Sequence, residues 1–429
     1  MSDRAVDRAS LEAKESIGKW TSRDTGWMLN LFGTAIGAGV LYLPIKAGAG
    51  GIWPLVVLGF LVGPMVWLPH RNLVRFCLSS VDPKANITVT VREHFGEGTG
   101  HILTLAYCLS VYPILLMYGI GMTNVVISYV ENQLHLEPPS RLWLSLILVV
   151  MLVVLMHTGE KWMLRAVKMM VYPLVVTLLC ISAYLIPHWN LSVFHQELSF
   201  RGLVTTLFFT TPLLIFSFNH SPACSALAQS YRQLMGSPEQ CRRKTQQILT
   251  RNTMLLLAVI LFFVFSCVLC LTPAELELAA RYNLPVLSVL SDKTGAGFFA
   301  YGTPLIGFLA LVSSFFGVYL GALEGIQGLV TQQWLKHCPE RPMRPMMVRK
   351  LAILFIVLTC WGAGCANWSV IGLIEAFVVP VLATILYIMP VYAYYRVERL
   401  QKYRNYWIDG FTVVVGIVAI CGFLVDKLT

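Results

Sequence analysis

Two clusters of helix-breaking residues interrupt otherwise apolar stretches of the sequence. The first places three glycines within seven residues, from Gly33 to Gly39, and glycine allows a ligand to approach bare backbone. The second runs from Ser217 to Pro222, where the proline lacks an N–H and frees the carbonyl of Phe218 to coordinate an ammonium group or a metal cation. Freed backbone groups at membrane depth are tolerated only inside protein or around an aqueous cavity. Both clusters are therefore candidate binding segments.

Ionisable side chains inside apolar stretches are the second kind of candidate, because a charge is costly to bury there. We expect Glu324, in the inner part of its stretch, to carry a coupling proton or to form a gate; a plain structural hydrogen bond is the alternative. Glu375 lies five residues before Pro380, which should break its helix, and we favour it as a gate or proton carrier. His220 can titrate near neutral pH beside the second cluster, although a structural histidine is the competing interpretation.

The elements that position these residues are apolar helices long enough to cross a membrane. The chain is 56% hydrophobic and 13% charged, with a mean hydropathy of +0.68, which is far from the composition of a soluble globular protein. Stretches of about 20 apolar residues recur, and most are apolar around the whole circumference, which disfavours barrel strands. We count eleven expected spans: 27–45, 52–74, 102–130, 142–157, 163–186, 202–222, 253–271, 300–330, 351–366, 370–395 and 406–425.

The basic residues predict how these spans are oriented. If the chain crosses the membrane eleven times, 26 of the 32 Lys and Arg residues lie on the same side of the membrane as the amino terminus. Basic residues are retained on the cytoplasmic side during insertion. The polar residues 1–26 are therefore expected to form a cytoplasmic tail, without a cleavable signal peptide, and the carboxyl terminus to be periplasmic. This distribution also explains the formal charge of +10 without a nucleic-acid partner.

Other functional classes lack sequence support. The chain has no Walker loop, which disfavours an ATP-driven pump, and Glu93-His94 lacks the second histidine of a zinc-protease helix. The eleven cysteines show no metal-type pair spacing and are expected to be small apolar fillers. We therefore expect neither an enzyme nor a bound cofactor.

The two clusters occupy corresponding places in the chain. The first lies in span 1, which starts inside, and the second in span 6, which starts outside, so residues 27–186 and 202–395 can form a five-plus-five inverted repeat, with 406–425 as an extra helix. Paired interruptions of this kind indicate the central site of a transporter. Taken alone, Gly33 and Gly37 are equally well explained as a small-residue packing surface between helices.

These segments resemble the hydroxy and aromatic amino acid permeases of the amino acid/polyamine/organocation superfamily, and within them the serine and threonine permeases. The resemblance extends over almost the whole chain apart from its tail. It rests on the segments 33–41, 43–44, 112–116, 216–222, 262–267, 271–274 and 319–322.

The resemblance implies a fold of the leucine-transporter type, with a small amino acid held between helices 1, 3, 6, 8 and 10. Its carboxylate would then lie at the N–H groups of Gly37, Ala38 and Gly39, at the positive end of a half-helix. Its ammonium would face the carbonyls from Phe216 through Ser217 and Phe218 to Asn219. The candidate wall side chains are Asn219, His220, Tyr112 and Tyr118, although each tyrosine is more often a packing residue.

The coupling ion stays open between a proton and sodium. In this superfamily a hydroxyl pair on helix 8 helps to form a sodium site, and the chain has Ser313 and Ser314 there, where serine permeases commonly carry lysine at the first position. The resemblance implies a symporter in the bacterial inner membrane, embedded in lipid, with serine as the first expected substrate, threonine the second and an aromatic amino acid the third. A non-transporting nutrient sensor is the alternative, and a channel is disfavoured because no pore loop is apparent.

The orientation can be tested with reporters at the two ends of the chain. A reporter active only in the periplasm should work when fused after Thr429 and fail when fused before Trp27, because the basic residues hold the amino-terminal side in the cytoplasm. A correctly inserted protein with a silent carboxyl-terminal reporter would rule out the eleven-span topology.

Overall fold

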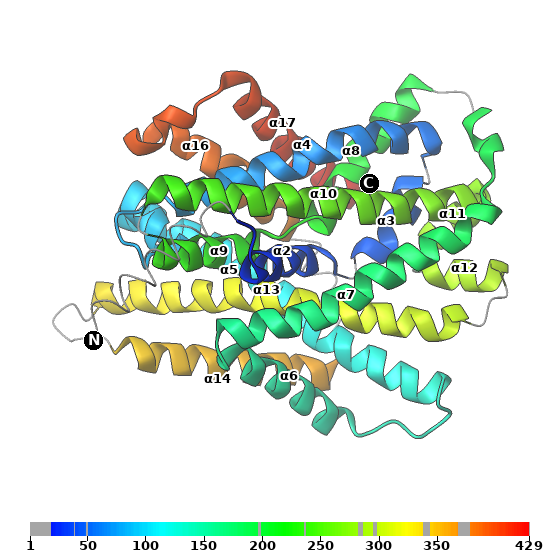
Figure 1. The fold of residues 1–429 in the computed structure, drawn as a ribbon, viewed down its shortest axis with the longest axis horizontal. Coiled ribbons are helices and arrows are strands. Elements are labelled where there is room, and N and C mark those ends of the chain that lie inside the picture. Colours follow the sequence, from blue (N-terminus) through cyan, green and yellow to red (C-terminus); the bar gives the residue numbers. More distant parts are fainter. Residues whose placement is uncertain are drawn as a thin grey trace.

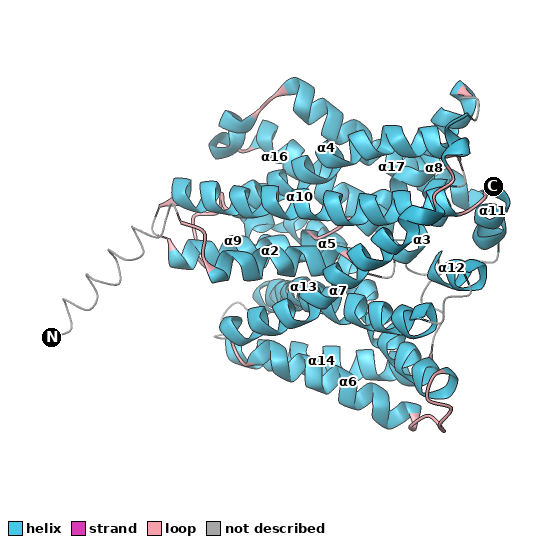
Figure 2. Ribbon diagram, turned by 45° about the vertical axis from the view of Figure 1, so that its right-hand side comes forward, coloured by secondary structure: helices cyan, strands magenta, loops and turns pink. Residues whose placement is uncertain are grey.

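The computed structural model describes residues 19–37, 39–48, 50–195, 199–235, 237–281, 286–294, 298–337, 344–367 and 378–428. Every regular element within these ranges is a helix (Figure 2). Nine of the described helices are long and apolar enough to cross a membrane, and the bent pair α2 and α3 raises that number to ten. The expected all-helical membrane class is confirmed. The count of eleven spans is not, since α6 is apolar but has only 17 residues.

The first half of the chain holds α2 (Ser22–Ala35), α3 (Gly39–Gly48), α4 (Ile52–Cys77), α5 (Ile87–Asn132), α6 (Arg141–His157), α7 (Glu160–Leu185), and the 3-10 turns η1 (Ile186–His188) and η2 (Leu191–His195). The second half begins with α8 (Phe200–Ser217), α9 (Ser221–Leu234), α10 (Pro238–Cys270), α11 (Pro273–Arg281), α12 (Val286–Thr294) and α13 (Phe298–His337). It ends with α14 (Pro345–Ala366), the π-helical η3 (Thr384–Ile388), α16 (Met389–Arg396), the 3-10 helix η4 (Glu398–Tyr403) and α17 (Tyr406–Leu428).

The short helices α2 and α3 occupy the middle of the bundle (Figure 1). The longer helix α10 packs against both of them, and α13 packs against α2. The pair α6 and α14 lies at one edge, and α16 and α17 lie at the opposite edge (Figure 1). The glycine-rich first span is thus surrounded by other helices, which lets its irregular backbone avoid lipid.

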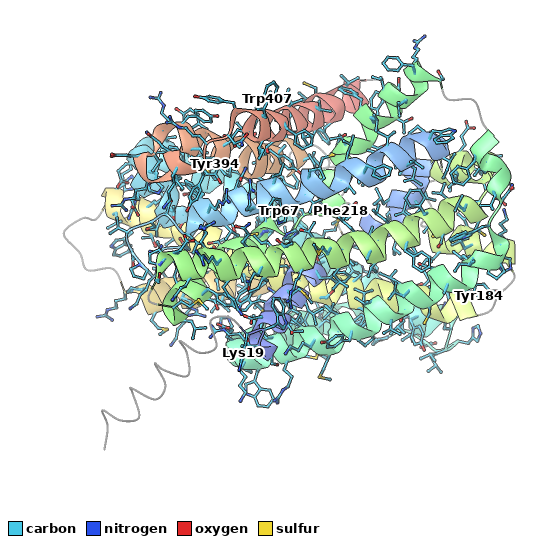
Figure 3. The ribbon with its side chains drawn as sticks, turned by 45° about the horizontal axis from the view of Figure 1, so that its top comes forward. Lys19, Trp67, Tyr184, Phe218, Tyr394 and Trp407 are labelled. Carbon is cyan, nitrogen blue, oxygen red and sulfur yellow. The ribbon has the colours of Figure 1, made fainter. Side chains whose placement is uncertain are left out.

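The outer surface of the bundle is apolar, as a lipid-facing surface requires. Large side chains are exposed on peripheral helices, including Trp143 on α6, Leu354 on α14 and Trp407 on α17, the last of which is 90% exposed. In contrast, Phe218 lies deep inside the bundle and is 1% exposed (Figure 3). A soluble protein would rarely present such extensive apolar surface to water.

Helix α2 begins five residues before the expected start of span 1 at Trp27. Thr21 and Asp24 form a capping box, in which the Asp24 N–H donates to the Thr21 hydroxyl (3.3 Å) and the Thr21 N–H donates to the Asp24 carboxylate (2.7 Å). Such a box satisfies two backbone donors that a helix start would otherwise leave free. The residues just before Trp27 are therefore part of the packed bundle, and α2 begins within the segment 1–26 that was expected to be the tail.

The same aspartate anchors the start of α2 to two other helices. Its carboxylate lies 2.7 Å from the Lys244 ammonium on α10, and both side chains are at least 97% buried. The Tyr231 hydroxyl on α9 donates to the other carboxylate oxygen. Close by, Arg23 binds Glu160 on α7 at 2.7 Å. The amino-terminal end of α2 is thus fixed to α7, α9 and α10 by charged groups rather than by apolar packing alone.

Removal of Lys244 should destabilise the protein strongly, because Asp24 would remain buried without its counter-charge. We expect Lys244→Met to lower the unfolding free energy by about 3 to 5 kcal/mol. The matched control is Arg243→Met, whose side chain is 74% exposed beside Glu239 and should cost less than about 1 kcal/mol. Thermal and denaturant unfolding in detergent would measure both effects; equal stability of the two variants would contradict the buried ion pair.

Candidate functional site

The first expected interruption is a real break in the helix. Helix α2 ends at Ala35, α3 begins at Gly39, and the two axes differ by 58°. Ile36 leaves the helical conformation, and the N–H of Gly37 turns back to the carbonyl of Ala35 (3.0 Å). The amide of Gly37 is therefore already partnered in this conformation, in contrast to its expected role as a free donor to a carboxylate.

The second expected interruption is also present, between α8 and α9. Helix α8 ends at Ser217, and Pro222 stands in the first turn of α9, a position where a missing N–H costs little. The carbonyl of Phe218 is not free as expected, because it accepts from Nδ1 of His220 (3.0 Å). The side-chain oxygen of Asn219 accepts from the N–H of Ser221, the first residue of α9 (3.0 Å).

The two breaks face each other across a small central cavity. A side chain at Gly39 would place its Cβ 3.0 Å from the Ser217 hydroxyl oxygen and 3.3 Å from the ring of Phe216. Only glycine therefore allows the start of α3 to approach the end of α8 so closely. The cavity between them is lined by Thr34, Ala35, Gly37, Gly39, Ile114, Tyr118, Phe216, Ser217, Asn219 and Val318.

The described conformation is closed around this cavity. The space open to water-sized molecules is ≈ 10 Å³, about what a single water requires. Ser217 is 2% exposed, and no hydrogen-bond partner for its hydroxyl exists among the described residues. A buried hydroxyl without a partner carries a free-energy cost, so this atom is the group in the cavity wall best prepared to bind a polar ligand.

A chain of hydroxyl groups connects the first break to α5 and α13. The Ser314 hydroxyl donates to the carbonyl of Thr34 (2.8 Å) and accepts from the phenol of Tyr118 (2.7 Å). The neighbouring Ser313 lies against Gly33: a Cβ added to Gly33 would lie 2.9 Å from the Cβ of Ser313. The expected hydroxyl pair on α13 is thus placed beside the end of α2, next to the cavity wall formed by Tyr118.

His220 packs against a second histidine that sequence reasoning missed. The rings of His220 and His70 on α4 are stacked, with centroids 3.6 Å apart and planes within 8°. The Nδ1 of His70 donates to the carbonyl of Val66 (2.7 Å), and its Nε2 accepts from the backbone N–H of His220 (3.1 Å). The side-chain nitrogen of Asn252 lies 3.4 Å from the Nε2 of His220. Each ring nitrogen of the two histidines therefore has a hydrogen-bond partner, and neither ring lines the cavity.

The remaining expected residues are dispersed. The hydroxyl of Tyr112 contacts Thr359, and its ring stacks on Phe355 of α14 with centroids 5.7 Å apart, so Tyr112 does not line the cavity. Glu324 lies on α13 six residues beyond Val318, about 9 Å along the helix axis. Ala38 and Glu375 lie outside the described residues, as does the segment before Pro380 in which a break was expected.

Four cavity residues were not named as candidates from the sequence: Thr34, Ala35, Ile114 and Val318. Thr34 and Ala35 lie within the first glycine-rich segment, so their place in the motif was an available signal. Ile114 and Val318 gave no such signal, because one apolar side chain among many on a membrane helix says nothing about which face meets the cavity. The same holds for His70, which becomes a partner of His220 only through the packing of α4 on α9.

Comparison with known proteins identifies the family. The model of the tryptophan/tyrosine permease family matches residues 25–358. The chain belongs to this family. The expected resemblance to hydroxy and aromatic amino acid permeases is thereby confirmed, and with it the assignment as a multi-pass membrane permease rather than an enzyme.

Members of known function extend over the same length. The serine transporter SdaC of Escherichia coli (strain K12) is 40% identical over 418 residues, which cover 96% of both chains. The serine transporter SdaC of Shigella flexneri is 39% identical with the same coverage. The family resemblance therefore includes both breaks and α13, and it is not confined to a shared apolar composition.

Solved structures show the same fold. The structure of MhsT in complex with L-phenylalanine matches with a TM-score of 0.59 at 12% identity, covering 94% of this chain and 97% of that one. A substrate-bound, outward-open Na+-coupled sialic acid symporter matches with a TM-score of 0.57 at 12% identity, covering 96% and 90%. At such low identity these matches establish the fold alone.

The close contact between α2 and α13 beside the cavity can be tested at Gly317. A Cβ there would lie 1.7 Å from the Thr34 hydroxyl oxygen, so Gly317→Ala should force the helices apart and lower the unfolding free energy by about 1 to 3 kcal/mol. Gly362→Ala is the matched control, since a Cβ at Gly362 on α14 would meet nothing within 4 Å. Melting temperatures in detergent report both; a Gly317→Ala protein that melts like the wild type would contradict this packing.

Proposed function

We propose that this chain is a secondary transporter that imports a small amino acid, serine first and threonine second, across the bacterial inner membrane by alternating access. The proposal rests on the cavity enclosed by the two helix breaks, which is where transporters with broken helices hold their substrate. The 40% identity to a serine transporter over almost the whole chain supports the choice of substrate.

The cavity offers a distinct partner for each polar group of serine. The carboxylate is placed at the start of α3, where a helix begins with N–H groups that have no acceptor within the helix; of these, the N–H of Val40 donates to the Gly37 carbonyl in this conformation (3.3 Å). The ammonium is placed at the end of α8, where the helical hydrogen bonding stops; there the carbonyls of Leu214 and Phe216 accept from the N–H groups of Phe218 and Asn219 in this conformation. The substrate hydroxyl is assigned to Ser217, because its own hydroxyl is buried in the cavity wall without a partner.

The size of the cavity favours a small substrate. A space of ≈ 10 Å³ must widen even for serine, and Phe216 and Tyr118 are the bulky wall residues that have to move. An aromatic amino acid is the second candidate, favoured by the name of the family, but it requires a much larger displacement of those two rings. A nutrient sensor built on the same fold would bind the ligand without moving it across the membrane.

The topology assigned to this transporter has eleven spans. Helix α6 is taken as a span, because its 17 residues are at the short end of the lengths that membrane-spanning helices have. Residues 27–186 and 202–395 form two inverted repeats that each open with a broken helix, and α17 is added outside the repeat. The amino terminus is cytoplasmic and the carboxyl terminus periplasmic, as the distribution of basic residues indicates.

Transport is coupled to an ion, and two sets of residues compete for it. Ser313 and Ser314 would hold sodium through their hydroxyl oxygens, together with carbonyls released where α2 ends, and such oxygens are the ligands that broken helices offer to Na+. For a proton the candidates are Glu375, which lies outside the described residues, and Glu324 and His220. The ring nitrogens of His220 are both engaged in hydrogen bonds, which favours Glu324 between these two.

The function can be tested by counterflow of labelled amino acids in liposomes that contain the purified protein. Preloaded serine should drive entry of labelled serine fastest, of threonine more slowly, and of tryptophan or tyrosine least. Counterflow requires the site to alternate between the two sides of the membrane, so a sensor would bind serine without showing it. Fastest counterflow of an aromatic amino acid would instead establish the second candidate.

The role of Ser217 can be tested in the same liposomes. Ser217→Ala should lower the affinity for serine relative to alanine about tenfold, equivalent to about 1.4 kcal/mol, because the substrate hydroxyl would lose its partner inside a closed site. Ser266→Ala is the matched control, since Ser266 on α10 is also fully buried with an unpartnered hydroxyl but does not line the cavity. An unchanged serine to alanine ratio in Ser217→Ala would refute the assignment.

A further inference from the structure

A second polar cluster lies between α13 and α9, beyond the cavity along α13. Its centre is the carboxyl of Glu324, which is partly exposed overall but whose Oε2 is sealed from solvent without a hydrogen-bond partner. The hydroxyl of Ser225 on α9 faces the carboxyl and accepts from the N–H of Ile87 (3.0 Å). The cluster therefore bridges α13 and the second half of the broken sixth span.

A tyrosine completes the cluster from α5. Tyr107 is 2% exposed, and its hydroxyl has no partner among the described residues. This hydroxyl fills a notch on α13 left by Gly321, where a Cβ would lie 2.7 Å from the phenol oxygen and 2.8 Å from the Cβ of Pro222. Gly321 is one helical turn from Glu324, so α5, α9 and α13 meet at this point.

Among the described residues, no cation is paired with Glu324. The ionisable groups that face it are Tyr107 on α5 and Cys77 on α4. Each of these is neutral when it carries its proton. Arg232 on α9 lies near Cys77 and donates to the carbonyl of Ser80 (2.8 Å), and the ion pairs recorded for the described residues do not include Glu324.

A carboxylate in this position costs free energy, since neither a cation nor a full set of donors compensates its charge. A bound proton removes that cost and gives Glu324 an O–H that can donate to the Ser225 hydroxyl. If α9 moved away from α13, water would reach the carboxyl and the charged form would no longer be penalised. Protonation of Glu324 and the packing of α9 on α13 are therefore linked, each favouring the other.

We propose that Glu324 is the site that binds the transported proton, and that this proton must be present for α9 to pack against α13. The inference rests on the proposed transport function and identifies its coupling ion. The step is a simple proton transfer: the carboxylate binds H+ while the site accepts substrate, and it releases H+ to the opposite side once α9 has moved from α13. No change in covalent bonding other than the O–H bond of the carboxyl is involved.

The test uses the purified full-length protein in sodium-free liposomes, with Glu324→Gln as the variant. Glutamine keeps the shape of a protonated carboxyl but cannot release a proton. Glu324→Gln should therefore exchange serine in counterflow at equal pH within about threefold of the wild type, while uptake driven by an acid-outside pH gradient falls at least tenfold. Glu97→Gln, on an 82% exposed carboxyl of α5, is the matched control and should preserve both activities.

The outcomes separate this inference from the function on which it rests. Wild-type protein without serine counterflow would refute the proposed function. Wild-type counterflow without any response to the pH gradient, or a Glu324→Gln protein that still responds to it, would overturn the proton site and leave transport intact. A purely structural role for Glu324 would reduce counterflow and gradient-driven uptake in parallel, which also overturns the proposal.

A second variant keeps the proposal testable if Glu324→Gln does not fold. Tyr107→Phe removes a hydroxyl that has no hydrogen-bond partner among the described residues, so it should leave folding intact. Because this O–H is a donor available to a charged Glu324, its loss should disfavour the charged form and raise the pH midpoint of gradient-driven uptake by about one unit. An unchanged midpoint would contradict the assignment of the proton to this cluster.

Discussion

The need to satisfy backbone polar groups inside a membrane governs this structure. A helix meets that need within itself, so each place where a helix is broken must find partners elsewhere in the protein. At the first break the Thr34 carbonyl is satisfied by Ser314 of α13, and at the second the Phe218 carbonyl is satisfied by His220. The breaks can therefore exist only in the middle of the bundle, where α13 and the start of α9 supply these partners and the surrounding helices exclude lipid. The cavity is a consequence of that arrangement.

Glycine and charge fix the position of the central helix pair by different means. Near the cavity, Gly317 lets α13 approach the side chain of Thr34 on α2, and Gly39 lets α3 approach Phe216 and Ser217 on α8. At the start of α2, the buried pair of Asp24 and Lys244 makes contacts whose loss would leave a charge in an apolar interior. Apolar packing tolerates gradual displacement, whereas such an ion pair is either made or broken.

Three of the buried polar atoms that have no partner among the described residues lie where function is assigned. The Ser217 hydroxyl lines the cavity, and the Tyr107 hydroxyl and Glu324 carboxyl lie at the junction of α5, α9 and α13. Fully satisfied groups, such as the stacked His70 and His220, hold structure together instead. In a protein interior an unsatisfied group is unfavourable, so its persistence at these two places is the common basis for assigning a substrate contact to one and a proton site to the other.

The sequence alone determined the membrane class, the position of most spans, both helix breaks and the family. These features depend on local physics: the length of apolar stretches, the flexibility of glycine, and the missing N–H of proline. Gly37, Gly39, Phe216, Ser217 and Asn219 could be placed at the cavity for the same reason. Only the tertiary structure decided that Tyr118 lines the cavity while Tyr112 contacts α14, that His220 faces His70, and that α2 starts early through Asp24 and Lys244. Those outcomes depend on which face of one helix meets another, and a helix that is apolar on every side carries no periodic signal to reveal that face.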